Sequence, residues 1–425
     1  MGKKIMLNKH FAVLLAGKRY SPEFQKEAQY AAGWKRVLET AYGSTYAVCQ
    51  CPGKGARKLS IKRRDDTDNF HLARFRDSGP EHAMECRFYS PAPERSGLQG
   101  YSKGVVEERE DGSLRIKLAR GLRIQAASGE PRTSVRQATL SAPGERKPAM
   151  TLLGLLHLLW SESRLNIWFP AMEGKRSPGL IYSKLRETAS RIAANQVPLE
   201  KVLLLAAQKD SKEAIKNKQL AELAAVKGYR LVAISPLARY DAERHSQELT
   251  RLPLVGPFGM PSLTLEPTDW TRAVKRFGHE ISAWKRGARV MVIAQLSVTS
   301  GAAPLQGQVL ELALMQVTDR WIPVDSSYES LIEERLHAAQ RSFEKPLRYD
   351  ASKFEYFPDF WLLDMGKHYP IEVFGMASEG YLEHKVSKSQ WYDRLYGSQG
   401  WWSWDAAADA SNDNVPELPV KPMNN

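Results

Sequence analysis

Two strand-like runs joined by a short turn constrain this chain more than any other part of its sequence. Residues 354–361 and 370–374 are aromatic and β-branched, and the residues between them have turn composition. With Gly366 as the second central turn residue, an antiparallel hairpin places Asp359 directly opposite Glu372. Two carboxylates side by side repel each other unless a cation lies between them, and Mg²⁺ prefers hard oxygen ligands. The hairpin therefore predicts a magnesium or manganese site.

Residues on two flanking helices are candidates for the same site. Glu329 lies on the flank of the buried face of a helix predicted from 328 to 340, and Glu333 is its alternative one turn later. Lys388 and Lys385 share one face of a later helix. A lysine beside such acids can orient an attacking water and offset negative charge in a phosphoryl transition state. The predicted catalytic residues are Glu329, Asp359, Glu372, Lys388 and Lys385.

These residues, in this order, resemble the PD-(D/E)xK nuclease superfamily from residue 324 to residue 396. The Pro-Asp pair ending at Asp359 matches the first acid of the motif, and Glu372 matches the second. Phe374 stands where the motif has lysine. This segment is similar to a variant in nuclease domains attached to some helicase-family proteins, in which the next helix supplies the lysine. Lys388 is then its counterpart, with Lys385 as the alternative.

The resemblance implies a restriction-endonuclease-like α/β core over residues 321–404. Asp359 and Glu372 would hold the metal, and Glu329 would complete its coordination or orient water. Lys388 would orient or activate the nucleophile. Because Phe374 departs from the motif, a second hypothesis stays open, in which a catalytically inactive DNA-binding or assembly factor uses the same fold as a scaffold. A zinc-stabilised protein-interaction module with incidental basic charge is a third.

The three cysteines of the chain all lie near the N-terminus, in two paired knuckles. Cys49 and Cys51 form Cys-x-Cys, and His82 and Cys86 form His-x3-Cys, with strands predicted between them. Three thiolates and one imidazole can close a tetrahedral Cys3His site, whereas three cysteines cannot make a disulfide framework. The sequence predicts a structural zinc ion in a β module over residues 1–100, with ordinary buried cysteines as the alternative.

The middle of the chain is basic and then helical. Residues 101–148 are predicted to be a basic linker with one hairpin. Residues 149–226 are predicted to be a helical domain. Their order of helix, turn and basic helix matches either a winged-helix unit or three helices that pack together without binding DNA. A winged-helix unit would contact nucleic acid through the basic side chains of this segment, which are Lys175, Arg176, Lys184, Arg186 and Arg191.

The remaining segments complete a multidomain α+β prediction. Residues 227–320 are predicted to form an α/β domain with a helix over 270–286, and the tail from 405 to 425 is predicted to be disordered. No Walker loop, Gly-x-Gly-x-x-Gly or Gly-x-Ser-x-Gly occurs, which argues against nucleotide hydrolysis and serine chemistry.

Charge indicates the kind of partner. Lys and Arg total 61 against 48 Asp and Glu, a net charge of +13, which favours a polyanion such as DNA. No apolar run approaches the roughly 18 residues of a membrane span, and the start lacks a signal-peptide core, so a cytoplasmic location is expected. The whole chain is also similar to an uncharacterised bacterial family typical of plasmids and integrative elements, which implies other mobile-element proteins as partners but no activity.

Overall fold

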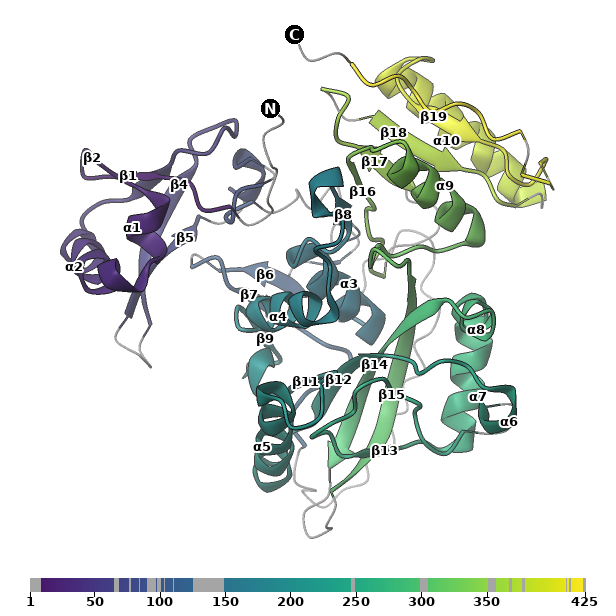
Figure 1. Cartoon of the computed structure of the whole chain (residues 1–425), viewed down its shortest axis with the longest axis horizontal. Helices are drawn as coiled ribbons and strands as arrows, with labels where there is room; N and C mark the ends of the chain where they lie inside the picture. Colours follow the sequence, from purple (N-terminus) through teal and green to yellow (C-terminus); the bar gives the residue numbers. More distant parts are fainter. Residues whose placement is uncertain are drawn as a thin grey trace.

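The computed structural model is a mixed α/β protein in which helices cover four β-sheets within the described residues (Figure 1). None of the described helices has the length and apolar character needed to cross a bilayer. The structure describes residues 9–64, 69–75, 78–83, 85–89, 97, 101–102, 104–109, 111–124, 149–245, 249–298, 305–350, 357–366, 369–376, 379–409, 411–412 and 414–422.

The N-terminal sheet is the β module predicted around the cysteines, and each of its strands is antiparallel to its neighbours. Its order is β2-β1-β3-β4-β5, built from β1 (Val13–Leu15), β2 (Lys18–Tyr20), β3 (Ala47–Cys49), β4 (Lys58–Arg64) and β5 (Asn69–Arg74). Two helices, α1 (Pro22–Lys26) and α2 (Ala31–Ala41), precede β3. The break between them lets Phe24 of α1 contact Trp34 of α2.

The second sheet contains the predicted basic hairpin, but this hairpin is part of a core rather than a linker. β6 (Val106–Glu108) and β7 (Leu114–Ile116) are antiparallel, and Gly112 takes a positive φ in their turn. β7 pairs in parallel with β9 (Ile192–Ala194), and β9 pairs with β10 (Val197–Pro198). Residues 125–148 of the predicted linker lie outside the described residues.

The third sheet has the order β11-β12-β14-β15-β13 and contains the strands predicted for residues 227–320. The predicted strands are β12 (Leu231–Pro236), β13 (Ser262–Thr264), β14 (Arg289–Val298) and β15 (Gln306–Val317). The fifth strand, β11 (Leu203–Leu205), lies within residues 149–226, which were predicted to be helical. β11 and β12 are parallel and are joined by α5 (Lys212–Lys227). The helix predicted over 270–286 is divided at Phe277 into α7 (Pro267–Arg276) and α8 (Gly278–Lys285), and the short α6 (Ala242–His245) precedes them.

Residues 149–226 do not form the separate helical domain that the sequence predicts. α3 (Leu152–Glu162) is apolar on all sides and lies against β14 and β15, because a helix without a polar face must be enclosed. α3, α4 (Pro178–Ala189) and the third sheet share one continuous hydrophobic core. The predicted boundary at 226/227 therefore runs through a single core.

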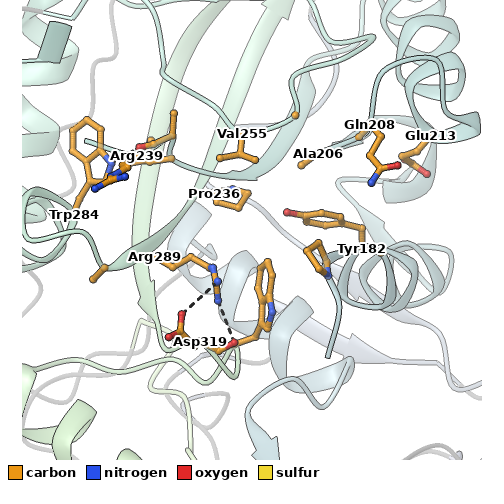
Figure 2. Close-up of a pocket in the computed structure, with 18 of the residues that line it drawn as sticks. Tyr182, Ala206, Gln208, Glu213, Pro236, Arg239, Val255, Trp284, Arg289 and Asp319 are labelled. Carbon is orange, nitrogen blue, oxygen red and sulfur yellow. Dashed lines mark hydrogen bonds and ion pairs between the residues drawn. The ribbon is translucent and has the colours of Figure 1, made fainter. Parts of the chain in front are cut away.

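A cavity of about 960 Å³ opens beyond the carboxyl ends of the parallel strands β11 and β12 (Figure 2). α4, the first turn of α5, the end of α8 and the turn that follows β15 line it. Gly256 lies so close to the chain after β11 that a Cβ there would be 2.6 Å from the carbonyl oxygen of Ala207. Glycine at this position therefore shapes one wall of the cavity.

The fourth sheet contains the predicted hairpin that brings Asp359 and Glu372 together. Its order is β19-β18-β17-β16-β8, from β16 (Phe343–Glu344), β17 (Phe360–Leu362), β18 (Tyr369–Val373), β19 (Trp402–Trp404) and β8 (Ile167–Trp168). α9 (Ser327–Ala338) and α10 (Glu379–Tyr396) lie beside it (Figure 1). Because β8 comes from the central region, the predicted boundary at 320/321 does not separate two independent units.

The register of this hairpin is the predicted one. Phe360 pairs with Ile371, so the next pair outward is Asp359 with Glu372. Residues 351–356 and 367–368, which include part of the predicted first strand and of the turn, lie outside the described residues. Composition of a turn and alternation of strand side chains were sufficient to predict this register.

The C-terminal tail packs against the fourth sheet, so the prediction of disorder is wrong for its described residues. Trp402 Nε1 donates a hydrogen bond to the carbonyl of Glu417 at 2.9 Å, and Arg341 Nη1 donates to that of Pro419 at 2.6 Å. Val415 and Leu418 lie against the core of the sheet. A segment rich in Asp, Asn and Pro is ordered here because Trp402 on β19 and Arg341, just before β16, satisfy two of its carbonyls.

Buried His157 on α3 should make stability depend on pH. Its Nδ1 accepts a hydrogen bond from the amide of Tyr349 at 2.9 Å, and burial lowers the pKa of His157 from 6.5 to about 4. Between these values the unfolded chain binds more protons, so the free energy of unfolding should fall by roughly 3 kcal/mol as pH drops from about 6.5 to about 4. Urea titrations should show this loss, and it should shrink in His157→Asn, which keeps an acceptor. The same pH dependence in both proteins would contradict the assignment.

Candidate functional site

The four predicted metal ligands of the N-terminal module converge. Cys49 ends β3, Cys51 lies in the turn after it, and His82 and Cys86 follow the 3₁₀ turn Gly79–Glu81. All four are buried, and their ligand atoms lie within 4.8 Å of one another. The Sγ of Cys51 is 3.6 Å from Nδ1 of His82, and the Sγ atoms of Cys49 and Cys86 are 3.7 Å apart. This cluster could hold a metal ion such as zinc.

Backbone amides in this cluster are directed at two of the sulfur atoms and would stabilise them as thiolates. The amide of Ala83 points to the Sγ of Cys51 at 3.4 Å, and the amide of Phe88 points to that of Cys86 at 3.5 Å. Such N–H donors stabilise negative charge on sulfur. Gly53 allows the two knuckles to approach, because a Cβ there would be 2.2 Å from the carbonyl oxygen of Glu81. Three sulfurs and one imidazole nitrogen are the donor set that zinc takes in structural sites.

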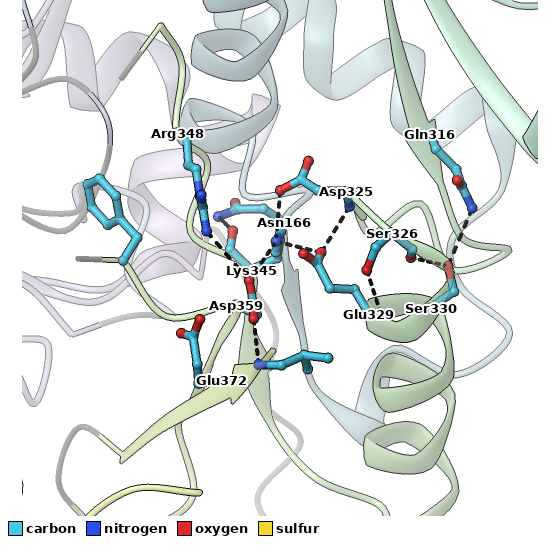
Figure 3. Close-up of polar contacts among 12 residues, drawn as sticks. Asn166, Gln316, Asp325, Ser326, Glu329, Ser330, Lys345, Arg348, Asp359 and Glu372 are labelled. Atoms are coloured by element: carbon cyan, nitrogen blue, oxygen red, sulfur yellow. Dashed lines mark hydrogen bonds and ion pairs between the residues drawn. The ribbon is translucent and has the colours of Figure 1, made fainter. Parts of the chain in front are cut away.

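A second group of charged side chains lies where α9, the hairpin and α10 meet. Figure 3 shows the members of this group other than the α10 residue. We call this group the acid–lysine cluster. The acidic and basic side chains that define it are Asp325, Glu329, Asp359, Glu372, Lys345, Arg348 and Lys388. Three of the acids and both lysines are at most 5% exposed. Four carboxyl groups face three cationic groups in this cluster.

Asp359 sits just before β17 and is buried in the cluster. Its Oδ2 accepts a hydrogen bond from the amide of Val373 at 2.7 Å, which fixes the carboxylate across the hairpin. Its Oδ1 lies 3.6 Å from Nη2 of Arg348 and 4.0 Å from Nζ of Lys345. The strand register and this backbone bond together set the position of the first hairpin acid.

Glu372 on β18 is held by residues of α10. Its Oε1 is 2.5 Å from Nζ of Lys388, and its Oε2 accepts a hydrogen bond from the hydroxyl of Tyr392 at 3.1 Å. Burial, reinforced by the charge of Asp359, raises the pKa of Glu372 to about 7 although Lys388 opposes the shift. Lys388 also donates to the carbonyl of Phe357 at 2.8 Å. The lysine of the following helix therefore reaches the hairpin.

Glu329 has a structural task as well as a place in the cluster. Ser326 caps α9 by accepting a hydrogen bond from the amide of Glu329 at 3.0 Å, and Glu329 Oε2 accepts one from the amide of Asp325 at 2.9 Å. The same oxygen is 2.6 Å from Nζ of Lys345. Burial raises the pKa of Glu329 to about 8 against the attraction of Lys345. Its conformation follows from the Ser326 cap, the hydrogen bond from the Asp325 amide just before that cap, and a buried ion pair.

Three residues of the cluster were not predicted from the sequence: Asp325, Lys345 and Arg348. Lys345 follows β16, is 1% exposed, and also lies 3.1 Å from Oδ2 of Asp325. Asn166, beside β8, fixes its backbone through two hydrogen bonds of 2.8 Å, one in each direction. The one local indication of the role of Lys345 was its position directly after the strand residues Phe343 and Glu344. Its partner Asn166 is too far away in the chain for local pattern analysis to connect them.

Two predicted alternatives lie elsewhere. Lys385 pairs with Asp405, and its Nζ lies 5.1 Å from the ring centroid of Phe374, so it does not join the acid–lysine cluster. Glu333 is fully buried but pairs with Arg320 at 2.6 Å. One helical turn separates each of them from the residue that does reach the cluster.

The five predicted nucleic-acid contacts do not form a free basic face. Arg176 donates to the carbonyls of Leu165 at 2.9 Å and Arg320 at 2.7 Å, and Arg186 donates to that of Leu203 at 2.7 Å and pairs with Glu213. The other three basic side chains also do not form a set that is free to contact nucleic acid. Lys184 pairs with Glu187, Lys175 donates to the carbonyl of Ala171, and burial lowers the pKa of Arg191. Charge along the sequence did not reveal that four of these five side chains contact protein groups.

Fold and sites define a mixed α/β protein with a buried Cys3His ligand set and a separate buried cluster of carboxylates and lysines. A family model described as "Protein of unknown function (DUF1173)" matches residues 23–407, and the chain belongs to this family. Comparison with curated proteins and with solved structures gave no match.

Proposed function

We propose that the chain is a metal-dependent nuclease of a mobile genetic element, and that it hydrolyses DNA phosphodiester bonds at the acid–lysine cluster. The observation that carries the proposal is the meeting of Asp359, Glu372 and Lys388 from three separate elements at one buried point. These residues occur in the order of the PD-(D/E)xK motif, with its lysine supplied by α10. The net charge of +13 supports a nucleic-acid substrate.

The residues would divide the reaction among them. Asp359 and Glu372 would hold Mg²⁺ or Mn²⁺, which supplies charge neutralisation at the scissile phosphate. Lys388 would orient the attacking water, whose oxygen adds to phosphorus as the bond to the leaving oxygen breaks. Lys345 and Arg348 would stabilise the additional negative charge of the transition state, and Glu329 holds Lys345 in place.

We further propose that the Cys3His cluster binds zinc as a structural ion. Its ligands are enclosed and come from two segments, the end of the central strand β3 and the chain that follows the edge strand β5. A set of four protein ligands leaves no coordination position for a substrate, which is the arrangement of structural zinc. The ion would tie the two knuckles together in a module with a small hydrophobic core.

The nuclease proposal is tested with purified full-length protein and end-labelled single-stranded, duplex and branched DNA. Cleavage of at least one substrate is expected when Mg²⁺ or Mn²⁺ is present, and none is expected without them. Parallel reactions with RNA establish which nucleic acid is the substrate. Absence of cleavage on every substrate with either metal would remove the catalytic claim.

Lys388 and Lys385 provide a matched pair of variants on α10. Lys388→Ala should lower the single-turnover cleavage rate by about 100-fold or more, because it leaves the nucleophile without a positioning group and Glu372 without its partner. Lys385→Ala removes only a partly exposed pair with Asp405 and should cleave at the wild-type rate. Equal losses in both variants would refute the assignment of Lys388.

One observation favours a scaffold without catalysis. The lysines occupy the space between the carboxylates, since Lys388 contacts Glu372 and Lys345 contacts Glu329. Within the described residues, the Cys3His cluster is the one set of three or more ligands close enough to hold a metal without movement. An inactive DNA-binding or assembly factor would keep these ion pairs, bind DNA and show no affinity for Mg²⁺ at Asp359. Calorimetric titration of wild type and Asp359→Asn with Mg²⁺ distinguishes the two functions.

A further inference from the structure

We propose that the cavity at the carboxyl ends of β11 and β12 binds a nucleotide unit, meaning an aromatic base that carries a phosphate group. The source would be a free nucleoside phosphate or the end of a single nucleic-acid strand. The site is separate from the acid–lysine cluster, and the proposal does not depend on nuclease activity. Its volume, about 960 Å³, is at the upper end of the usual range for small-molecule sites and is sufficient for a whole nucleotide.

The position of the cavity in the fold is one at which α/β proteins bind phosphate-bearing ligands. β11, α5 and β12 form a parallel βαβ unit, and the cavity lies beyond the carboxyl ends of both strands. Ser211, the N-cap of α5, is part of its wall, so the positive end of a 16-residue helix faces the cavity. A negatively charged group would be stabilised at this end.

Charge in the cavity wall also favours an anion. Two arginines are already neutralised, because Arg186 pairs with Glu213 and Arg289 lies 3.5 Å from Asp319. Arg239 is exposed, lines the cavity, and makes no hydrogen bond or ion pair with any described residue. It therefore gives the wall one uncompensated positive charge. A guanidinium free at a cavity wall is suited to phosphate oxygens.

An aromatic side chain forms another part of the wall. Tyr182 on α4 is directed toward Pro236 and Ala206 (Figure 2), and its ring lies edge-on to Trp321 at 6.2 Å between centroids. Its hydroxyl has no hydrogen-bond partner among the described residues, although burial raises the pKa of Tyr182 to about 12. A half-buried ring with a free hydroxyl can stack on a base and donate a hydrogen bond to it.

The test uses full-length protein carrying Asp359→Asn, in buffer without divalent cations, so that cleavage cannot interfere. Calorimetry measures binding of adenosine 5′-phosphate, inorganic phosphate and a 5′-phosphorylated single-stranded oligonucleotide. Binding of the mononucleotide identifies a free nucleotide as a sufficient ligand, whereas binding of the oligonucleotide alone identifies a strand end. If neither binds, or if inorganic phosphate binds as tightly as they do, the proposal is overturned.

Variants locate the binding in this cavity. Gly179 lines the cavity mouth in α4, and an added Cβ there meets nothing within 4 Å, so Gly179→Trp should fold and occupy the cavity. We expect it to abolish binding. Tyr182→Ala and Arg239→Ala should each weaken binding about tenfold, while Tyr182→Phe should retain most of it because the ring remains.

Arg272 supplies the matched control. It is an exposed arginine on α7 that does not line the cavity, and its guanidinium contacts only groups of the same helix among the described residues, the Asp269 carboxylate and the carbonyl of Thr268. Arg272→Ala changes net charge as Arg239→Ala does and should bind as wild type does. Equal weakening in both arginine variants would indicate general charge attraction, and unchanged binding in Gly179→Trp would place the ligand elsewhere; either result overturns the assignment.

Discussion

Asp359→Asn should reduce metal-dependent DNA cleavage by about 1000-fold or more while leaving the protein folded. The amide oxygen of asparagine can still accept the hydrogen bond from Val373, so the hairpin keeps its geometry. The variant loses the negative charge that would bind the divalent cation. Losing charge stabilisation worth several kcal/mol, at about 1.4 kcal/mol for each factor of ten, gives this magnitude. Single-turnover assays over a range of Mg²⁺ concentrations provide the measurement.

Asp405→Asn is the control for this variant, because Asp405 is partly exposed and pairs with Lys385 outside the cluster. It should cleave at the wild-type rate and unfold at nearly the wild-type temperature. Undiminished cleavage by Asp359→Asn would show that the hairpin acids are not catalytic. If wild type lacks cleavage but binds DNA with a steep salt dependence, the scaffold function is favoured.

Replacing Cys49 and Cys51 together by serine should remove the metal and unfold the N-terminal sheet. Structural zinc contributes about 10–16 kcal/mol to small zinc-bound modules, more than a core of this size can replace. Wild type should contain about one zinc per chain by mass spectrometry of the elements, and the double variant should contain none. Limited proteolysis should then cut the variant between β1 and β5 while the central core resists.

His337→Asn is the matched control for His82→Asn in the same metal measurement. His337 is a partly exposed histidine that pairs with Glu173, outside the Cys3His cluster. Only the His82 variant should lose zinc. A wild-type protein that is folded and free of metal would instead support the interpretation of the cysteines as ordinary core residues.

Short-range chemistry made part of the site predictable. The turn at Gly366 and the alternation of the flanking strands placed Asp359 against Glu372, and helical spacing put Lys388 on the face that meets them. The two metal-binding knuckles were predictable for the same reason, since ligands of structural zinc typically occur in closely spaced pairs. In each case a few neighbouring residues determine the geometry.

Residues whose role depends on distant partners were not predictable. Lys345 is positioned by Asn166, and Arg176 is turned inward by the carbonyls of Leu165 and Arg320. A basic side chain looks the same in sequence whether it faces solvent or a buried carbonyl. The tail was misjudged for the same reason, because its partners are Trp402 on β19 and Arg341 just before β16, outside the tail itself.

The pairing of β8 with β16 has a consequence for the order in which the molecule folds. β8 and its neighbour Asn166 precede the rest of the fourth sheet by nearly half of the chain, yet they form its edge and hold Lys345. Contacts between such distant segments carry a large loop-closure cost and form late. The acid–lysine cluster should therefore be assembled only after α3 and the central core have formed. In a newly synthesised chain, that cluster would form in one of the last steps of folding, when most of the hydrophobic surface is already buried.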